Sequence, residues 1–140
     1  MVTPYIVFSS GLCEEAVSFY EKVFTGKNKT ILRYDDYKPD TDIALPIDLN
    51  NYVLHAELEI YNTKFTFADE VAMPVNQGNM IYLTINPESV KEAKKICNAL
   101  IEDGEFLLNP TETFYSPLHT TIKDKFGILW NIIVVMKCIE

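Results

Sequence analysis

The chain has 140 residues, and a chain of this length can bury a core large enough to fold without disulfides or metals. Its apolar fraction of 48% excludes an intrinsically disordered protein. Twelve basic and twenty acidic residues give a net charge of −8, which repels nucleic-acid phosphates and anionic lipid, so we expect a soluble protein without a nucleic-acid partner.

The cysteines and the N-terminal segment indicate where the protein is found. Cys13, Cys97 and Cys138 are odd in number and far apart, which favours reduced thiols over a disulfide framework. Residues 1–10 lack the basic segment, apolar run and cleavage site of a signal peptide, and no apolar run reaches the ~20 residues of a membrane span. The sequence therefore predicts a cytoplasmic protein without a membrane partner.

The first half of the chain predicts a strand, a helix and three further strands. Residues 2–9 are a short apolar run typical of a buried strand, and from Cys13 the apolar side chains follow helical spacing. Gly26 is expected to end this helix. Strands are then predicted over residues 28–34, 52–61 and 64–68, with a loop over residues 35–51.

The same order recurs in the second half. Residues 79–86 form an apolar strand, Asn86 can cap a second helix, and Gly104 can end it. Strands follow over residues 105–108, 118–123 and 128–136. His55 and His119 fall at matching places in the closing hairpins of the two halves.

The repeated order predicts the architecture. We expect one α+β domain over residues 1–140, made of two sequential β-α-β-β-β modules at residues 1–70 and 79–140. Residues 70–78, with Pro74 and Gly78, are the expected linker. A plain mixed domain with coincidental symmetry is the alternative.

Several short segments resemble the PhnB-like branch of the vicinal oxygen chelate superfamily, which includes glyoxalase I, extradiol dioxygenases and the fosfomycin and bleomycin resistance proteins. The matching segments are Thr3-Pro4-Tyr5, Cys13-Glu14-Glu15-Ala16, Phe19-Tyr20, Val23-Phe24, His55-Ala56-Glu57-Leu58, Glu112-Thr113-Phe114 and Asp124-Lys125-Phe126-Gly127. The resemblance implies a cup-shaped mixed sheet with the helices on its outer face, a homodimer, and, in the enzymes, a divalent metal in the cup. It implies no particular reaction, because one fold carries many chemistries.

The resemblance also implies four metal-ligand positions, which the family fills with His, Glu or Gln. In this chain they fall on Tyr5, Phe67, Met80 and Asn131. None of these side chains offers the imidazole or carboxylate that Zn, Fe, Mn or Ni prefers. We therefore expect no metal and no other cofactor, unless the register is shifted by one residue.

Strand alternation assigns side chains to the cup. If both closing hairpins have short loops of even length, His55 shares a face with Thr66 and His119 shares one with Trp130, pointing away from the cup. The cup face is then expected to hold Tyr5, Val7, Leu54, Ala56, Leu58, Phe65, Phe67, Met80, Tyr82, Thr120, Ile122, Leu129 and Asn131. Such a surface is typical of a small-molecule pocket and equally of a filled core. Trp130 is expected in the core beneath the second helix.

The remaining chemistry candidates each have two interpretations. His55 and His119 are surface or core histidines, or else ligands or general bases. Glu57 and Glu59 form a solvated strand face, or else one of them pairs with His55 as base and orienter. The resemblance places Glu112 near the mouth of the cup. Glu112 either contacts a ligand there, or it has a structural role in a turn or a dimer contact.

The resulting hypothesis is a PhnB-like homodimer that binds a small, largely apolar molecule without a metal. Its candidate ligand-binding residues are Tyr5, Leu58, Phe67, Met80, Tyr82, Glu112 and Asn131. The alternative is a metal-dependent lyase, isomerase or dioxygenase of the same superfamily, with ligands at other positions. Whether the protein is an enzyme stays open, and no catalytic residue is predicted.

Overall fold

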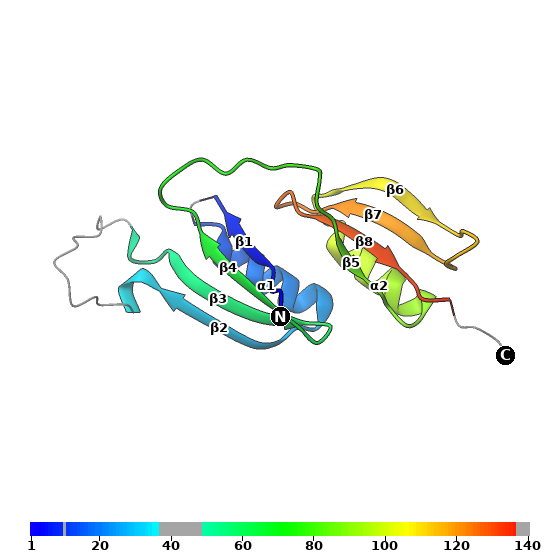
Figure 1. Ribbon diagram of the computed structural model, residues 1–140, viewed down its shortest axis with the longest axis horizontal. Coiled ribbons are helices and arrows are strands. Elements are labelled where there is room, and N and C mark those ends of the chain that lie inside the picture. The colour runs from blue at the N-terminus through cyan, green and yellow to red at the C-terminus, as the bar shows by residue number, and fades with distance from the viewer. Residues whose placement is uncertain (10, 37–48, 137–140) are drawn as a thin grey trace. The chain divides into compact units, whose positions relative to one another are not determined.

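A computed structural model describes residues 1–9, 11–36 and 49–136 (Figure 1). The chain divides into two compact units, Met1–Asn76 (unit 1) and Gln77–Glu140 (unit 2). In the described residues each unit has a strand, an α-helix and three more strands, and its four strands form one mixed sheet. The predicted α+β fold with two β-α-β-β-β modules is confirmed. The loop predicted over residues 35–51 falls largely outside the described residues.

Unit 1 places its helix against one face of its sheet (Figure 1). Its elements are β1 (Tyr5–Phe8), α1 (Cys13–Phe24), β2 (Lys27–Arg33), the short 3-10 helix η1 (Tyr34–Asp36), β3 (Val53–Ile60) and β4 (Thr63–Asp69). The strand order is β1-β4-β3-β2, with β1 parallel to β4 and the other pairs antiparallel. The apolar stripe of α1 is buried, and the ring of Tyr20 lies 6.1 Å from that of Phe67 on β4. The core of unit 1 therefore lies between α1 and the sheet.

Unit 2 repeats this arrangement. Its elements are β5 (Leu83–Ile85), α2 (Val90–Leu100), β6 (Glu105–Thr111), β7 (His119–Lys123) and β8 (Leu129–Ile133). The strand order is β5-β8-β7-β6, with β5 parallel to β8. Trp130 on β8 is fully buried together with Ala93 and Leu100 of α2, which confirms its predicted place in the core.

The start of α2 differs from the prediction. The cap is Ser89, whose hydroxyl accepts a hydrogen bond from the backbone N–H of Glu92 over 3.1 Å. Asn86, the predicted cap, instead donates its side-chain amide to the carbonyl of Ile133 over 3.0 Å. The helix therefore begins at Val90, after the Ser89 cap, and the Asn86 side chain bonds β8 instead.

The two glycines expected to end the helices have another role. Thr25 and Asp103, not the glycines, take the left-handed conformation, with φ of 52° and 53°. A Cβ at Gly26 would lie 2.7 Å from the side chain of Leu58, and one at Gly104 would lie 2.5 Å from the carbonyl oxygen of Lys123. Glycine is thus needed at both positions because the chain leaving each helix passes close to its sheet.

The closing hairpins of the two units differ in the parity of their turns. Ile60 pairs with Thr63 in unit 1, which leaves a turn of two residues, the even length predicted. Lys123 pairs with Leu129 in unit 2, so residues 124–128 form a turn of odd length. An odd turn reverses the alternation of the following strand. The assumption of even turns is therefore wrong for unit 2.

The face assignments change accordingly. Thr121 pairs with Asn131 and Ile122 with Trp130, so His119, two residues before Thr121, shares a face with Asn131 and not with Trp130. In unit 1, His55 lies on the face of Thr66 as predicted, because Glu57 pairs with Thr66.

The predicted cup face is also wrong for several of its residues, which lie on the side of the sheet that packs against the helix. Phe67 is fully buried against α1, and the same side of the unit 1 sheet holds Ala56, Leu58 and Phe65. Thr120 and Ile122 lie on the buried side of the unit 2 sheet with Trp130. The exposed surface is the opposite side of each sheet, which we call its open face. Tyr5 and His55 belong to the open face of unit 1, and His119 and Asn131 to that of unit 2.

The two α-helices of the described residues have 12 and 11 residues. Among these residues no helix has the length and apolar character needed to cross a bilayer.

Candidate functional site

The open face of unit 2 carries a hydrogen-bonded cluster around His119. Its Nδ1 atom lies 2.5 Å from the Tyr115 hydroxyl, and its Nε2 atom lies 3.3 Å from Oδ1 of Asn131. The hydroxyl of Thr121 donates to the same Oδ1 over 2.7 Å. We call these four residues the His119 cluster. Each member holds the next in one orientation, so the cluster is a fixed set of polar atoms.

Apolar side chains flank the His119 cluster. Leu108 on β6 is the cross-strand partner of Thr121, and Ile133 on β8 is the partner of His119. The ring of Phe114 meets that of Tyr115 edge to face at 5.2 Å and is 92% exposed. A strand face with fixed polar atoms between accessible apolar groups has the composition of a small-molecule site.

The open face of unit 1 carries a different, charged cluster. The Tyr5 ring stacks on the His55 ring at 6.4 Å, and Nε2 of His55 lies 3.3 Å from Oε1 of Glu57. Oε2 of Glu57 lies 3.0 Å from the Lys64 ammonium. The hydrogen bond from Lys64, and after it the one from His55, lowers the pKa of Glu57 below its usual value. Glu57 thus bridges His55 and Lys64, and it remains ionised above its lowered pKa.

Four of the predicted ligand-binding residues lie on strands. Tyr5 and Asn131 lie on open faces, where a ligand can reach them. Leu58 and Phe67 are 0% exposed in the core of unit 1. Strand pairing therefore does not bring Tyr5 together with Leu58 and Phe67, although alternation had placed them on one face.

The other three lie next to strands. Met80 and Tyr82 precede β5, and Glu112 directly follows β6; all three are exposed. Their role in binding stays a prediction.

Two members of the His119 cluster, Tyr115 and Thr121, were not among the residues predicted from the sequence. Thr121 could have been found, because a residue two positions along a strand from His119 shares its face. Tyr115 had no such signal, since it lies in the irregular segment between β6 and β7.

The structure revises the positions that the resemblance assigns to a metal. Tyr5 pairs with Thr66 in unit 1, and Asn131 pairs with Thr84 in unit 2. The residues that lie beside Tyr5 and Asn131 on the neighbouring strands are therefore Thr66 and Thr84, and not Phe67 and Met80. These side chains carry only neutral hydroxyl and amide oxygens, which do not fit a divalent transition metal. Among the described residues no group of three or more His, Cys, Asp or Glu side chains could hold a metal ion.

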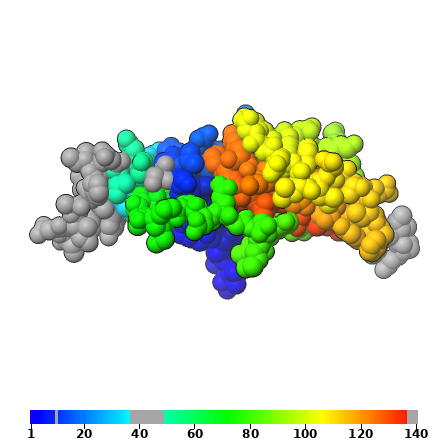
Figure 2. Space-filling view, turned by 90° about the horizontal axis from the view of Figure 1, so that it is seen from above, coloured from blue at the N-terminus to red at the C-terminus, as the bar shows by residue number. Residues whose placement is uncertain are grey.

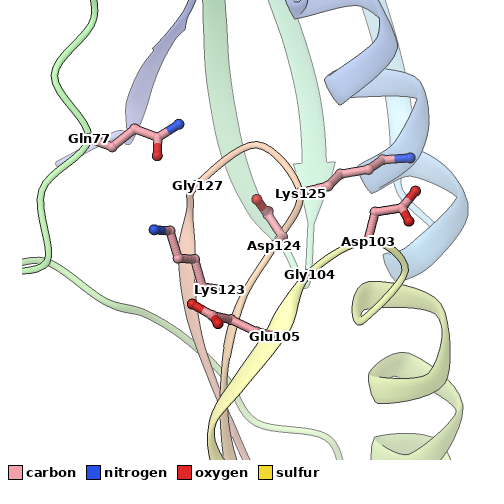
Figure 3. Close-up of a pocket in the computed structure, with 8 residues that line it drawn as sticks. All are labelled: Gln77, Asp103, Gly104, Glu105, Lys123, Asp124, Lys125 and Gly127. Atoms are coloured by element: carbon pink, nitrogen blue, oxygen red, sulfur yellow. The ribbon is translucent and has the colours of Figure 1, made fainter.

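A polar hollow of about 250 Å³ lies beside the β7–β8 turn of unit 2 (Figure 3). Its lining is Gln77, Asp103, Gly104, Glu105, Lys123, Asp124, Lys125 and Gly127. The carboxylate of Asp124 is buried and accepts hydrogen bonds from the backbone N–H groups of Phe126 and Ile128 and from Nε1 of Trp130, at 2.8 to 3.0 Å. Asp124 therefore holds the turn beside the hollow in place.

Burial keeps the two described cysteines in the thiol form. Cys13 and Cys97 are free and buried. Burial, followed by the charges of Asp69 and Glu14, raises the pKa of the Cys13 thiol to about 12, and burial raises that of Cys97 to about 11. Both thiols stay protonated near neutral pH.

Solved structures define the class of fold. The protein PA1353 from Pseudomonas aeruginosa has a TM-score of 0.81 at 23% identity, covering 98% of this chain and 100% of that chain. A glyoxylase/bleomycin resistance protein/dioxygenase domain from Frankia sp. EAN1pec has a TM-score of 0.66 at 10% identity, covering 97% of each chain. The fold is thus the α+β fold of the glyoxalase-like proteins.

Sequence comparison defines the family within this class. The family model described as 3-demethylubiquinone-9 3-methyltransferase matches residues 1–133, and the chain belongs to this family. The PhnB protein from Bacillus cereus is similar at 22% identity and a TM-score of 0.70, covering 96% of this chain and 98% of that chain. Protein YjdN of Escherichia coli (strain K12) is 25% identical over 142 residues, 96% of this chain and 95% of that protein. The predicted resemblance to the PhnB-like branch is confirmed.

Proposed function

We propose that the protein binds a small, largely apolar molecule on the open face of unit 2, without a metal. The observation that carries this proposal is the His119 cluster. Its four polar side chains are held by one another, next to Leu108 and Ile133 on the neighbouring strands and to the ring of Phe114. A merely solvated strand face has no need of such fixed orientation.

Acetophenone, with an apolar ring and one carbonyl, is a suitable first probe. We expect its addition to ¹⁵N-labelled protein to shift the amide signals of His119, Thr121 and Asn131. The variant Asn131→Leu, which keeps the size of the side chain and removes its polar atoms, should weaken these shifts. If acetophenone moved none of these signals up to its solubility limit, the proposal would be wrong.

We further propose that two copies associate through β6. This strand is an edge of its sheet, all seven of its residues are exposed, and Phe106, Leu107 and Leu108 form an apolar run along it. Figure 2 shows the β6 residues, in yellow, at the molecular surface. Exposed apolar edges invite strand pairing, and a two-fold arrangement of β6 against β6 would cover this one.

Light scattering tests the dimer. We expect twice the 16.0 kDa subunit mass for the natural protein and one subunit mass for Leu107→Lys, which places a charge on the edge. Leu12→Lys, at an exposed leucine before α1, is the matched control and should stay dimeric. A monomeric natural protein, or a dimeric Leu107→Lys, would contradict this assembly.

We also propose that the protein works in the cytoplasm, and the free thiols of Cys13 and Cys97 support this compartment. Fractionation of cells with an antibody against the protein tests it, and recovery outside the cytoplasm would contradict it.

A further inference from the structure

The His119 cluster fixes the hydrogen-bond direction at each of its atoms. Oδ1 of Asn131 can only accept, and it receives the hydroxyl hydrogen of Thr121. Nε2 of His119 lies 3.3 Å from this same oxygen, so Nε2 must carry a hydrogen. In the neutral ring Nδ1 is then an acceptor, and it receives the hydroxyl hydrogen of Tyr115 over 2.5 Å.

Two groups of the cluster remain free to bond a ligand. Nδ2 of Asn131 makes no hydrogen bond among the described residues, and every buried side-chain nitrogen or oxygen there has a partner, so solvent reaches Nδ2. The Tyr115 hydroxyl uses its hydrogen in the bond to His119, so its oxygen can only accept a further hydrogen bond. Tyr115 is 44% exposed. The cluster presents one donor and one acceptor, on opposite sides of the His119 ring.

The cluster also lacks any charge in this tautomer. Tyr115, Thr121 and Asn131 are neutral side chains, and the imidazole carries one hydrogen. A carboxylate could accept from Nδ2 of Asn131, but the cluster offers no positive charge to compensate the lost hydration of the anion. A ligand that satisfies both groups therefore carries an acceptor at one end and a donor at the other.

We propose that the open face of unit 2 selects a neutral ligand that bears a carbonyl and an O–H or N–H group at separate ends of an apolar body. The carbonyl accepts from Nδ2 of Asn131, the O–H or N–H donates to the Tyr115 oxygen, and the body lies against Leu108 and Ile133. This specificity rests on the proposed function, since it names the ligand class of the same face.

The first test measures the tautomer. Long-range ¹H–¹⁵N correlation spectra at pH 8 distinguish the two neutral forms of a histidine ring, and the variant His55→Gln leaves His119 as the single histidine to assign. We expect the Nε2–H form. The Nδ1–H form would reverse every hydrogen bond of the cluster and overturn the inference.

The second test compares three para-substituted benzenes: 4-hydroxyacetophenone, 4-methoxyacetophenone and 4-hydroxybenzoate. We expect the hydroxy ketone to bind about fivefold more tightly than the methoxy ketone, the factor that one neutral hydrogen bond supplies, and the carboxylate to bind more weakly than the hydroxy ketone. Tyr115→Phe should remove the difference between the two ketones. Thr84→Val, on the neighbouring strand β5 of the same sheet, is the matched control and should preserve it.

The outcomes separate this inference from the proposed function. If acetophenone and both substituted ketones bind equally well at the cluster, the face binds small molecules but does not select the donor, and the inference fails alone. If no ketone binds, both fail. If Tyr115→Phe keeps the preference for the hydroxy ketone, Tyr115 is not the acceptor and the inference is wrong.

Discussion

Thr121 and Asn131 are cross-strand partners on β7 and β8, and the Thr121 hydroxyl donates to the side-chain oxygen of Asn131. This bond decides which atom of the Asn131 carboxamide faces His119 and which faces outward. Thr84 is the partner of Asn131 on the other side, in β5, and its side chain makes no hydrogen bond among the described residues. The two threonines thus flank Asn131 on its two neighbouring strands, one bonded to its side chain and the other not.

Thr121→Val should lower the free energy of unfolding by about 1 kcal/mol, the net value of one hydrogen bond. It should also change the ¹⁵N signals of the His119 ring, because Asn131 is then free to turn its carboxamide. Thr84→Val should stay within about 0.5 kcal/mol of the natural protein and leave the ring signals in place. Equal losses in the two variants, measured by urea unfolding, would show that the Thr121 bond does not matter.

Trp130→Ala should cost about 3 to 5 kcal/mol, because the ring is fully buried and its removal leaves a cavity beneath α2. The loss also leaves the Asp124 carboxylate without the Nε1 donor. Leu12→Ala, at an exposed position before α1, is the control and should cost far less in urea unfolding at the same protein concentration. An unchanged melting temperature in Trp130→Ala would contradict the packing of β8.

Two substitutions on opposite faces of the unit 1 sheet test the reassigned faces. Phe67→Ala should cost about 3 to 5 kcal/mol, since Phe67 packs against Tyr20 in the core. Tyr5→Ala should cost little, since Tyr5 lies on the open face and is 57% exposed. Chemical denaturation of both variants decides the matter, and a larger loss in Tyr5→Ala would restore the original face assignment.

Glu57 makes stability depend on pH in the acid range. Its folded-state pKa lies below the unfolded value, so its contribution is present above the unfolded pKa and is lost as pH falls through the folded pKa. The difference in stability between the natural protein and Glu57→Gln should therefore shrink in that window. Lys64→Met removes the largest cause of the shift, so NMR titration should show the pKa of Glu57 rising in that variant. A pKa unmoved by Lys64→Met would exclude the hydrogen bond from Lys64 as the cause.

Metal affinity should be negligible. The hydroxyl and amide oxygens of Tyr5, Thr66, Thr84 and Asn131 cannot compensate the lost hydration of a divalent cation. Calorimetry with Zn, Ni, Mn and Fe(II) on protein purified without a histidine tag is the measurement. One metal per subunit with a Kd below about 1 μM would support the metal-dependent alternative instead.

Periodicity was sufficient to predict the order of the elements. The apolar spacing from Cys13 to Phe24 predicted α1, and alternation over residues 52–61 predicted β3, because a helix or strand buries one face of its own local sequence. The register between strands was not predictable in the same way. It depends on the β7–β8 turn, where the Asp124 carboxylate accepts hydrogen bonds from Phe126, Ile128 and, on β8, Trp130.

The candidate site follows from this register. An error of one residue moves Asn131 away from His119, so the cluster could not be seen from alternation alone. Tyr115 reaches His119 from an irregular segment, whose path no local pattern specifies.

Asp69 has a consequence for the way unit 1 folds as it is made. Its buried carboxylate accepts hydrogen bonds from the backbone N–H groups of Gly11, Cys13 and Val53, at 2.8 to 3.0 Å. Asp69 is the last residue of β4, so the ribosome synthesises all three donors before it synthesises their acceptor. During synthesis, the hydrogen bonds that hold the start of α1 and the start of β3 therefore cannot form until Asp69 has left the exit tunnel.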